Sequence, residues 1–285
     1  MRILTEVNRQ SENFLVSSYL GRHAELYDTF YAEKPYAAEA EFVHSCIDRY
    51  RDGESIRMLE LACGTGNHAL EFEQRGYKVT ATDYSSDMLS QAQEKAERVG
   101  SRVVFLQQDM RSLTLPANAF DVAVCLFDSI GYVATNESLS NVLMGVHRCL
   151  RPGGLFVFEF WHAAALIKKY DPLRVRKWQL PNSEILRISE TVLMPEQQLA
   201  SVTYSIYELK SDGTYSHLRE VQTNRYFLVQ EMSHWLTMSG FSPVEWFSGF
   251  SRETAITEDS WHIVVIAKTE QLQNHATAFG PTVKM

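Results

Sequence analysis

Two glycines stand where the chain could bind a nucleoside-containing cofactor. Gly64 and Gly66 follow an apolar run at residues 57–61 and precede residues that could begin a helix. Glycine lets the backbone turn tightly and approach a ligand closely, because it has no Cβ. Asp83 ends the next apolar run, 19 positions after Gly64, where a carboxylate can accept hydrogen bonds from both hydroxyls of a ribose. The segment therefore predicts a nucleoside site.

Three interpretations of the glycine segment are open from the motif alone. A dinucleotide would use the pattern G-x-G-x-x-A, which Gly64, Gly66 and Ala69 satisfy, with its pyrophosphate at the helix N-terminus. S-adenosylmethionine has an adenine and a ribose but no phosphate, so the turn would instead face its amino-acid part. An ordinary tight turn between a strand and a helix would need no ligand. The segments around the motif must decide.

Alternating strand and helix patterns position these residues. Strand-like apolar runs occupy residues 57–61, 78–82, 103–107, 121–127 and 154–160. Apolar residues at helical spacing lie between the second and third runs, where Ser85 and Ser86 are candidate N-caps. They recur between the fourth and fifth runs and end at the turn Arg151-Pro152-Gly153-Gly154. Such alternation predicts parallel strands joined by crossover helices, and hence a doubly wound α/β sheet.

The pattern changes after residue 160. Three runs with polar alternation, at residues 185–193, 199–209 and 215–227, predict an antiparallel sheet inserted after the fifth strand. A helix at 230–240 and runs at 244–250 and 261–268 would complete a seven-stranded, mostly parallel main sheet. We expect one domain overall. Its parts are an N-terminal helical segment (1–50), a cofactor-binding core (51–162), the inserted sheet (163–228), the rest of the core sheet (229–270) and a C-terminal tail (271–285).

A series of motifs across residues 57–160 carries a resemblance. Asp109-Met110 follows the third strand, residues 120–132 lead from the fourth strand into a loop, and Arg151-Pro152-Gly153-Gly154 precedes the fifth. In order and spacing the series resembles the class I S-adenosylmethionine-dependent methyltransferases. Ala62 and His68 depart from it, since many members have glycine there. The resemblance implies a Rossmann-like fold and S-adenosyl-L-methionine as the cofactor.

A narrower resemblance extends toward the N-terminus. The residues Tyr27-Asp28, Tyr31, Lys34 and Tyr36 are similar to a segment of small-molecule N-methyltransferases, including enzymes that act on nucleotide-linked amino sugars. In that group the segment covers the cofactor as a lid, and the inserted sheet shapes the acceptor pocket. Tyr132 is a departure, because the amino-sugar enzymes have histidine in that loop.

The superfamily resemblance implies the cofactor-binding residues. Glu60, Ala62, Gly64 and Gly66 would line the methionine portion, and Asp83 would bind the ribose. Four implied residues would surround the adenine: Tyr84, Met88, Asp109 and Met110. Cys125 and Leu126 would contact the methionine amino group, and Tyr27 and Tyr36 would contribute from the lid.

Fewer features of the sequence indicate which residues would contact the acceptor. Tyr27 and Tyr132 could orient an acceptor or shield the sulfonium, and His162, after the fifth strand, is the candidate base; each could equally be structural. Asp128 could hold an ammonium or a hydroxyl, or cap the turn near Gly131. His217 and Arg225 are candidates for the pocket wall or for a solvated strand face. The remaining histidines show no partner spacing and receive no role: His23, His44, His147, His234 and His262.

Composition limits the class of protein. With 27 Lys and Arg against 35 Asp and Glu, the net charge is −8, so we expect no nucleic-acid partner. We expect no membrane span, since no apolar run reaches about 18 residues. The chain turns polar within its first residues, so we expect no signal peptide and a cytoplasmic protein. The four cysteines form neither a C-x-x-C pair nor a zinc-type cluster, so we expect no metal.

The predicted function is methyl transfer from S-adenosylmethionine to a small-molecule acceptor by in-line displacement. An amine nitrogen, as in an amino sugar, is the leading acceptor, and the hydroxyl of a small metabolite is the alternative. From other classes, a nicotinamide-dependent oxidoreductase or a non-catalytic S-adenosylmethionine-binding protein would share the glycine turn. The inserted sheet also offers a surface for a homodimer.

Overall fold

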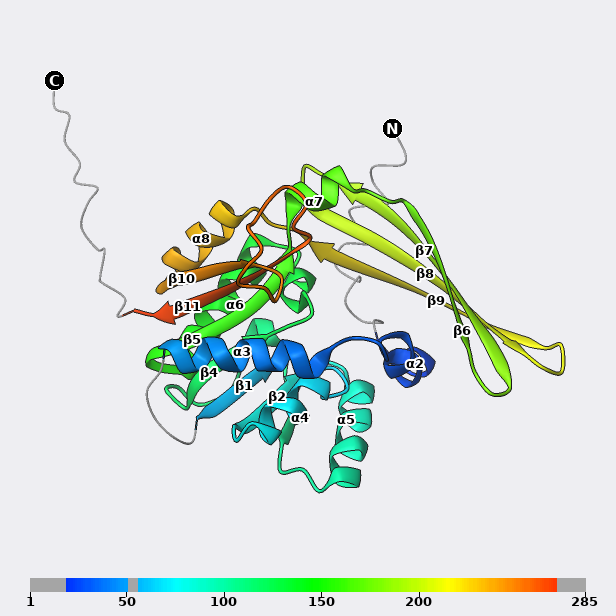
Figure 1. The fold of residues 1–285 in the computed structure, drawn as a ribbon, viewed down its shortest axis with the longest axis horizontal. Coiled ribbons are helices and arrows are strands. Elements are labelled where there is room, and N and C mark those ends of the chain that lie inside the picture. The colour runs from blue at the N-terminus through cyan, green and yellow to red at the C-terminus, as the bar shows by residue number, and fades with distance from the viewer. Residues whose placement is uncertain (1–18, 51–55, 271–285) are drawn as a thin grey trace.

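A computed structural model of the chain describes residues 19–50 and 56–270. The predicted tail (271–285) and most of the helical pattern predicted for the first twenty residues lie outside this range. The main sheet has seven strands in the order β10-β11-β5-β4-β1-β2-β3 (Figure 1). Their bounds are β1 (Arg57–Leu61), β2 (Lys78–Asp83), β3 (Val104–Gln107), β4 (Phe120–Cys125), β5 (Leu150–Trp161), β10 (Phe241–Ser248) and β11 (His262–Thr269).

Strand direction confirms the predicted fold class. Strands β1 to β5 pair in parallel, whereas β11 pairs antiparallel with both β5 and β10. The central parallel strands are buried on both faces, and in β4 every residue is buried, whereas the edge strand β3 is partly exposed. The order reverses between β1 and β4, and ligands of doubly wound sheets bind at such a point, beyond the carboxyl ends of the strands.

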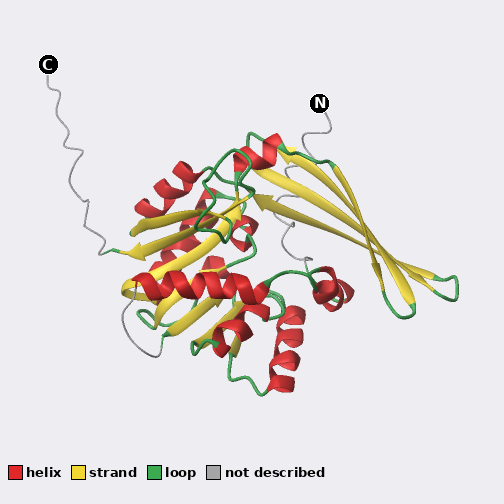
Figure 2. Cartoon of the chain, viewed as in Figure 1, coloured by secondary structure: helices red, strands yellow, loops and turns green. Residues whose placement is uncertain are grey.

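Helices cover both faces of the main sheet (Figure 2). One apolar core joins the sheet to α6 (Asn136–Cys149) and α8 (Val229–Met238), and a second joins it to α3 (Tyr36–Tyr50), α4 (Asn67–Gln74) and α5 (Ser86–Val99). The predicted cap Ser85 accepts a hydrogen bond from the backbone N–H of Met88 at 3.2 Å. The shorter elements are α2 (Arg22–Phe30), α7 (Ala163–Lys168), η1 (Met110–Ser112) and η2 (Ser129–Tyr132).

The inserted sheet has four antiparallel strands rather than the three predicted. They are β6 (Leu173–Gln179), β7 (Ser183–Met194), β8 (Leu199–Lys210) and β9 (Tyr215–Arg225), in that order across the sheet, and they extend away from the main body (Figure 1). We did not predict β6. It is an edge strand whose apolar residues Leu173 and Val175 are more than half exposed, so its sequence lacks the pattern of a strand with a buried apolar face.

The described residues bear on two further expectations. No helix among them is both long enough and apolar enough to cross a membrane. The four cysteines are buried free thiols that belong to the apolar core.

Candidate active site

A cavity of about 600 Å³ lies between the carboxyl ends of the parallel strands, helix α2 and the inserted sheet. A small adjoining space of about 20 Å³ shares Tyr27, Ala62 and Phe127 with it. Most of the predicted site residues line the large cavity: Tyr27, Ala62, Gly64, Asp83, Tyr84, Met88, Asp109, Met110 and Tyr132. Others line the small space: Tyr36, Glu60 and Leu126.

Asp83 holds the glycine turn against the end of β2. One carboxylate oxygen accepts a hydrogen bond from the Gly64 N–H and the other from the Ser85 N–H, each at 2.8 Å. Burial raises the pKa of Asp83, and these backbone donors oppose that rise. A Cβ on Gly64 would lie 3.2 Å from the terminal methyl of Met88. The turn, the carboxylate and Met88 therefore form one closely packed wall of the cavity.

Glu60 is a buried carboxyl that no cation neutralises within the part of the chain that the structure describes. It lies in β1, is 3% exposed, and its Oε2 has no hydrogen-bond partner within the described residues. Burial, assisted by the charge of Asp83, raises its pKa well above the usual range. Because an unpaired buried acid is costly, the small space beside it suits a group that donates hydrogen bonds or carries positive charge.

Asp109 lines the cavity but already has a cationic partner. The Arg111 side chain binds its carboxylate through Nε at 2.9 and 3.0 Å and through Nη2 at 2.6 Å. Partial burial raises the pKa of Asp109, but Arg111 outweighs it and the pKa is lowered. Tyr84 is half exposed at 52%, so these two residues form an open part of the cavity wall.

Three predicted residues, Gly66, Cys125 and His162, line neither space among the described residues, and their roles toward a ligand stay predictions. Gly66 serves close packing, because a Cβ there would lie 3.0 Å from the Phe105 ring. Cys125 is fully buried in β4, between two neighbouring strands. His162, the predicted base, is 7% exposed and its Nδ1 lies 3.1 Å from the carbonyl oxygen of Ser260.

The two candidates on the inserted strands are also outside the cavity lining. Arg225 pairs with Glu231 at 2.9 Å, and the ring of His217 stacks on Tyr207 with 4.4 Å between centroids. Both side chains have partners that account for their positions.

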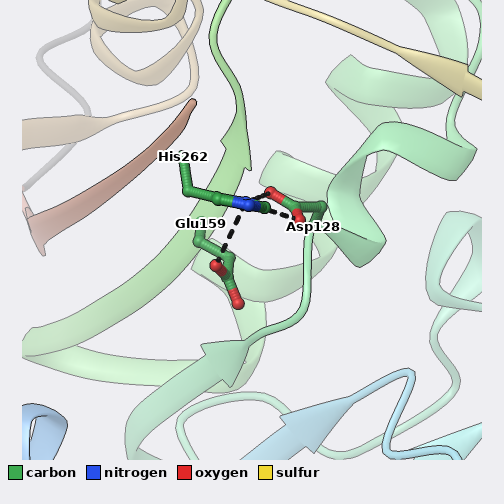
Figure 3. A group of neighbouring side chains, drawn as sticks. All are labelled: Asp128, Glu159 and His262. Carbon is green, nitrogen blue, oxygen red and sulfur yellow. Dashed lines mark hydrogen bonds and ion pairs between the residues drawn. The ribbon is translucent and has the colours of Figure 1, made fainter. Parts of the chain in front are cut away.

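A carboxylate–imidazole cluster that the sequence did not reveal lies at the cavity. His262 and Asp128 line the cavity, and Glu159 stands beside them (Figure 3). Nδ1 of His262 lies 3.0 and 2.8 Å from the two oxygens of Asp128 and 3.8 Å from Glu159. Asp128 and His262 are 134 positions apart, so no local spacing could have linked them.

Three arginines of the inserted sheet form a cationic wall, defined as Arg174, Arg176 and Arg187. All three line the cavity. Arg176 and Arg187 are directly opposed in the β6–β7 pair, and Arg174 lies two residues before Arg176, so the three side chains share one face of the sheet. Arg174 pairs with Asp171 at 3.0 Å. Two directly opposed like charges destabilise a strand pair, so an anion at this wall would relieve repulsion.

Arg187 is the buried member of the cationic wall. It is 6% exposed, and its Nε has no hydrogen-bond partner within the described residues. The guanidinium instead lies 4.8, 4.9 and 5.3 Å from the ring centroids of Phe30, Trp178 and Tyr204. Aromatic faces stabilise a guanidinium only partially, so an anion would supply the hydrogen-bond acceptor that Nε lacks within the described residues.

The segment before and at the start of α2 spans the cavity, and we call Tyr19, Gly21, Arg22 and His23 the α2 clasp. Its backbone is held on the core side, where Ser85 donates to the Tyr19 carbonyl at 2.9 Å and Asp87 accepts from the Gly21 N–H at 2.6 Å. Its side chains bind the inserted sheet, where His23 pairs with Glu220 and Arg22 with Glu208. The Tyr19 hydroxyl also lies 2.6 Å from the Tyr132 hydroxyl. The clasp thus connects the two sides of the cavity.

Comparisons with known proteins agree on one kind of domain. A family model described as "Methyltransferase domain" matches residues 58–154. A Bacillus subtilis protein named "Putative methyltransferase YqeM" is 28% identical over 218 residues, 76% of this chain and 84% of that protein. The dTDP-3-amino-3,4,6-trideoxy-alpha-D-glucopyranose N,N-dimethyltransferase of Streptomyces venezuelae is 35% identical over 141 residues, which are 49% of this chain and 57% of that enzyme.

Solved structures support the fold across both sheets. An S-adenosylmethionine-dependent methyltransferase from Clostridium acetobutylicum superposes with a TM-score of 0.76 at 20% identity, covering 88% of this chain and 98% of its own. The sugar N-methyltransferase KedS8 from Streptoalloteichus superposes with a TM-score of 0.72 at 21% identity, covering 90% of this chain and 96% of its own. At these sequence identities, the similarity shows the fold alone.

Proposed function

This chain is a class I S-adenosylmethionine-dependent methyltransferase, and on that premise we propose that it methylates an amine nitrogen of a small molecule that also carries an anionic group. A nucleotide-linked amino sugar is the leading example, since the Streptomyces venezuelae relative is named for such a substrate. S-adenosylmethionine supplies an activated methyl group on a sulfonium. The rest of the proposal concerns how this chain's own residues hold the two reactants.

The cofactor side of the cavity fits S-adenosylmethionine. Asp83 would accept hydrogen bonds from the ribose hydroxyls, and Glu60 would face the ammonium of the methionine portion. The unpaired Oε2 of Glu60 supports this assignment, because a cation is what a buried carboxylate without a partner needs. Tyr27 is 9% exposed and its side chain lies 3.9 Å from a Cβ built on Gly64. It would shield the reacting centre from water, which favours a displacement whose positive charge is spread between sulfur and nitrogen in the transition state.

The cationic wall carries the proposal for the acceptor. The whole chain has a net charge of −8, yet three arginines face one cavity on the side opposite the glycine turn. Arginine forms strong, paired hydrogen bonds with phosphate. An acceptor that reaches from the cofactor to the inserted sheet would therefore place a phosphate at this wall and its nucleophile near the sulfonium.

A substrate panel tests the proposed acceptor. Purified protein is incubated with S-adenosylmethionine and either dTDP-3-amino-3,4,6-trideoxy-D-glucose, the same sugar without its nucleotide, or the analogue with a hydroxyl in place of the amine. We expect S-adenosylhomocysteine to form fastest with the complete amino sugar. Methylation of the hydroxyl analogue alone would overturn the amine, and equal rates with and without the nucleotide would overturn the anionic requirement.

Replacing Asp83 with alanine is expected to weaken S-adenosylhomocysteine binding more than about tenfold, because charged hydrogen bonds contribute roughly 1.5–3 kcal/mol. Titration calorimetry measures the change, and Glu94→Ala, which removes an exposed carboxylate from α5, is the matched control. Circular dichroism must show that the variant is folded, since Asp83 also holds the glycine turn. Unchanged affinity in a folded Asp83→Ala protein would refute the ribose assignment.

Replacing Arg187 with methionine is expected to raise the KM for a nucleotide-linked acceptor about tenfold, through the loss of charge-assisted hydrogen bonds. The dissociation constant of S-adenosylhomocysteine should stay the same. Arg219→Met, at an exposed position on β9, controls for loss of charge alone. Arg176→Ala, at an exposed position in the cationic wall, should raise the KM in the same direction and avoids disturbing a buried site. A KM that neither variant changes would exclude the wall as an anion site.

A further inference from the structure

The proposed binding of the cofactor and of the anionic group does not use the cluster of Asp128, Glu159 and His262. We propose that Nε2 of His262 accepts the proton of the bound ammonium acceptor, with Asp128 as the residue that positions the imidazole. This inference rests on the proposed function, because it needs an acceptor that arrives as an ammonium. It assigns the role of base to a histidine on β11 instead of to His162.

The geometry gives the two ring nitrogens of His262 different tasks. Nδ1 faces both oxygens of Asp128, at 3.0 and 2.8 Å, as Figure 3 shows. A hydrogen bond from Nδ1–H to a carboxylate leaves Nε2 as the unprotonated nitrogen. No hydrogen bond engages Nε2 within residues 19–50 and 56–270, and the side chain is 39% exposed and lines the cavity. Nε2 is therefore the nitrogen available to a ligand.

Asp128 and Glu159 are fixed by the backbone around them. Phe127 and Asp128 both have positive φ, 57° and 56°, a conformation that costs energy for residues other than glycine and that gathers at functional sites. The Phe127 N–H donates to the Glu159 carboxylate. Asp128 is 6% exposed and Glu159 is 2% exposed. The turn after β4 thus holds the Asp128 carboxylate beside the imidazole, and the Phe127 N–H links this turn to Glu159 on β5.

The charges around the cluster favour proton exchange near neutral pH. Burial lowers the pKa of His262, but Asp128 and Glu159 outweigh it and the pKa is raised. Burial and the charge of Asp128 raise the pKa of Glu159 to about 8. Lys34, whose Nζ binds Glu39 at 2.6 Å, lowers both values in part. A cluster of one imidazole and two carboxyls can attract an ammonium and also take up its proton.

The proton and electron balance of the step is complete within the cavity. The N–H bond of the ammonium breaks, its proton passes to Nε2, and the imidazole becomes an imidazolium that Asp128 stabilises. The freed nitrogen lone pair forms the bond to the methyl carbon, while the electron pair of the carbon–sulfur bond stays on sulfur. Positive charge moves from sulfur to nitrogen. The partly exposed His262 then returns its proton to water.

The test compares kcat against pH for wild type and His262→Asn, with dTDP-3-amino-3,4,6-trideoxy-D-glucose as the acceptor. A base must be unprotonated, so wild-type kcat should fall as the pH drops below the pKa of His262. In His262→Asn we expect kcat to fall about 100-fold, within the usual range for a general base. The fall of kcat at low pH, the acid limb of the pH profile, should disappear. Added imidazole should restore part of the rate. Asp128→Asn should move the limb to lower pH, an effect that a purely structural role would not produce.

Matched measurements separate this inference from the proposed function. His234→Asn, an exposed histidine on α8, should leave kcat unchanged, and S-adenosylhomocysteine should bind all variants equally. If wild type does not methylate this amino sugar, the acceptor proposal fails. Nitrogen NMR of the S-adenosylhomocysteine complex then still tests His262, for which we expect the tautomer with the proton on Nδ1.

Three results would overturn the role of His262. The first is a neutral His262 that carries its proton on Nε2. The second is an acid limb of the pH profile that is the same in His262→Asn as in wild type. The third is activity that a chelator removes and a divalent cation restores. The last result would mean that the cluster binds a metal ion instead of a proton.

Discussion

Replacing Glu60 with glutamine is expected to weaken S-adenosylmethionine binding about 100-fold and, at the same time, to make the free protein more stable. The affinity falls because removing one member of a buried ion pair costs about 3 kcal/mol or more. The stability rises because the free protein buries a carboxyl whose Oε2 has no partner within the described residues. Glutamine has nearly the same shape and never ionises.

The raised pKa of Glu60 determines the pH range in which Glu60→Gln is more stable than wild type. Burial raises the folded-state pKa of Glu60 above its unfolded value, so the folded state binds a proton more tightly than the unfolded state. Stability from this group is present at low pH and is lost as the pH rises through and above the usual range of glutamate. Glu60→Gln removes that loss. Its thermal midpoint should therefore exceed the wild-type value at pH 8 by about 2 °C or more and approach it near pH 4.

Calorimetry and thermal unfolding with and without S-adenosylmethionine measure the two effects together. In wild type the ligand should raise the midpoint more than in Glu60→Gln, because stabilisation follows the ratio of ligand concentration to dissociation constant. Glu94→Gln, at an exposed position on α5, controls for the change of charge. A Glu60→Gln protein that binds the cofactor as tightly as wild type would refute the ammonium assignment.

Replacing Gly66 with alanine is expected to destabilise the protein by about 2–4 kcal/mol. Gly66 has a φ of +76°, and a Cβ would lie 3.0 Å from the Phe105 ring and 3.1 Å from the Ala92 Cβ. The backbone term costs roughly 1 kcal/mol, and overpacking costs about 1–3 kcal/mol more. The expected loss thus comes from packing between β3, α5 and the turn, and it does not require contact between Gly66 and a ligand.

Gly76 provides the matched control for Gly66. It also has a positive φ, +90°, but nothing lies within 4 Å of a Cβ built there. Gly76→Ala should therefore cost the backbone term alone, about 1 kcal/mol, and the difference between the two variants isolates the packing term. Urea unfolding measures both. Equal destabilisation by the two substitutions would show that the neighbours of Gly66 can move aside at little cost.

The main sheet was predictable because its signals are local. The parallel strands appear as short apolar runs, the central strand β4 is buried throughout, and the helix after β2 begins at a serine that caps it. The glycine turn and Asp83 lie next to these strands in sequence, so strand order alone brings them together at the carboxyl edge. Their roles toward the cofactor remain proposals.

The acceptor side was harder to predict because its contacts join distant segments. His262 meets Asp128 across 134 positions, and it does so because β11 inserts antiparallel beside β5. The arginines of the cationic wall face one cavity only through the pairing of β6 with β7, and β6 had no strand signal of its own. His162 was predicted from its place after β5, yet its ring turns to a buried backbone carbonyl.

The α2 clasp has a consequence for how fast the enzyme can turn over. The clasp residues hydrogen-bond to α5 on one side and to β8 and β9 on the other, and Tyr27 packs with Met88 beneath the same helix. If S-adenosylhomocysteine lies under this helix, as proposed, we expect it to leave only when those bonds break. Release of the spent cofactor would then depend on the opening rate of α2, in a step separate from methyl transfer. A second methylation of the proposed amine would have to wait for that exchange.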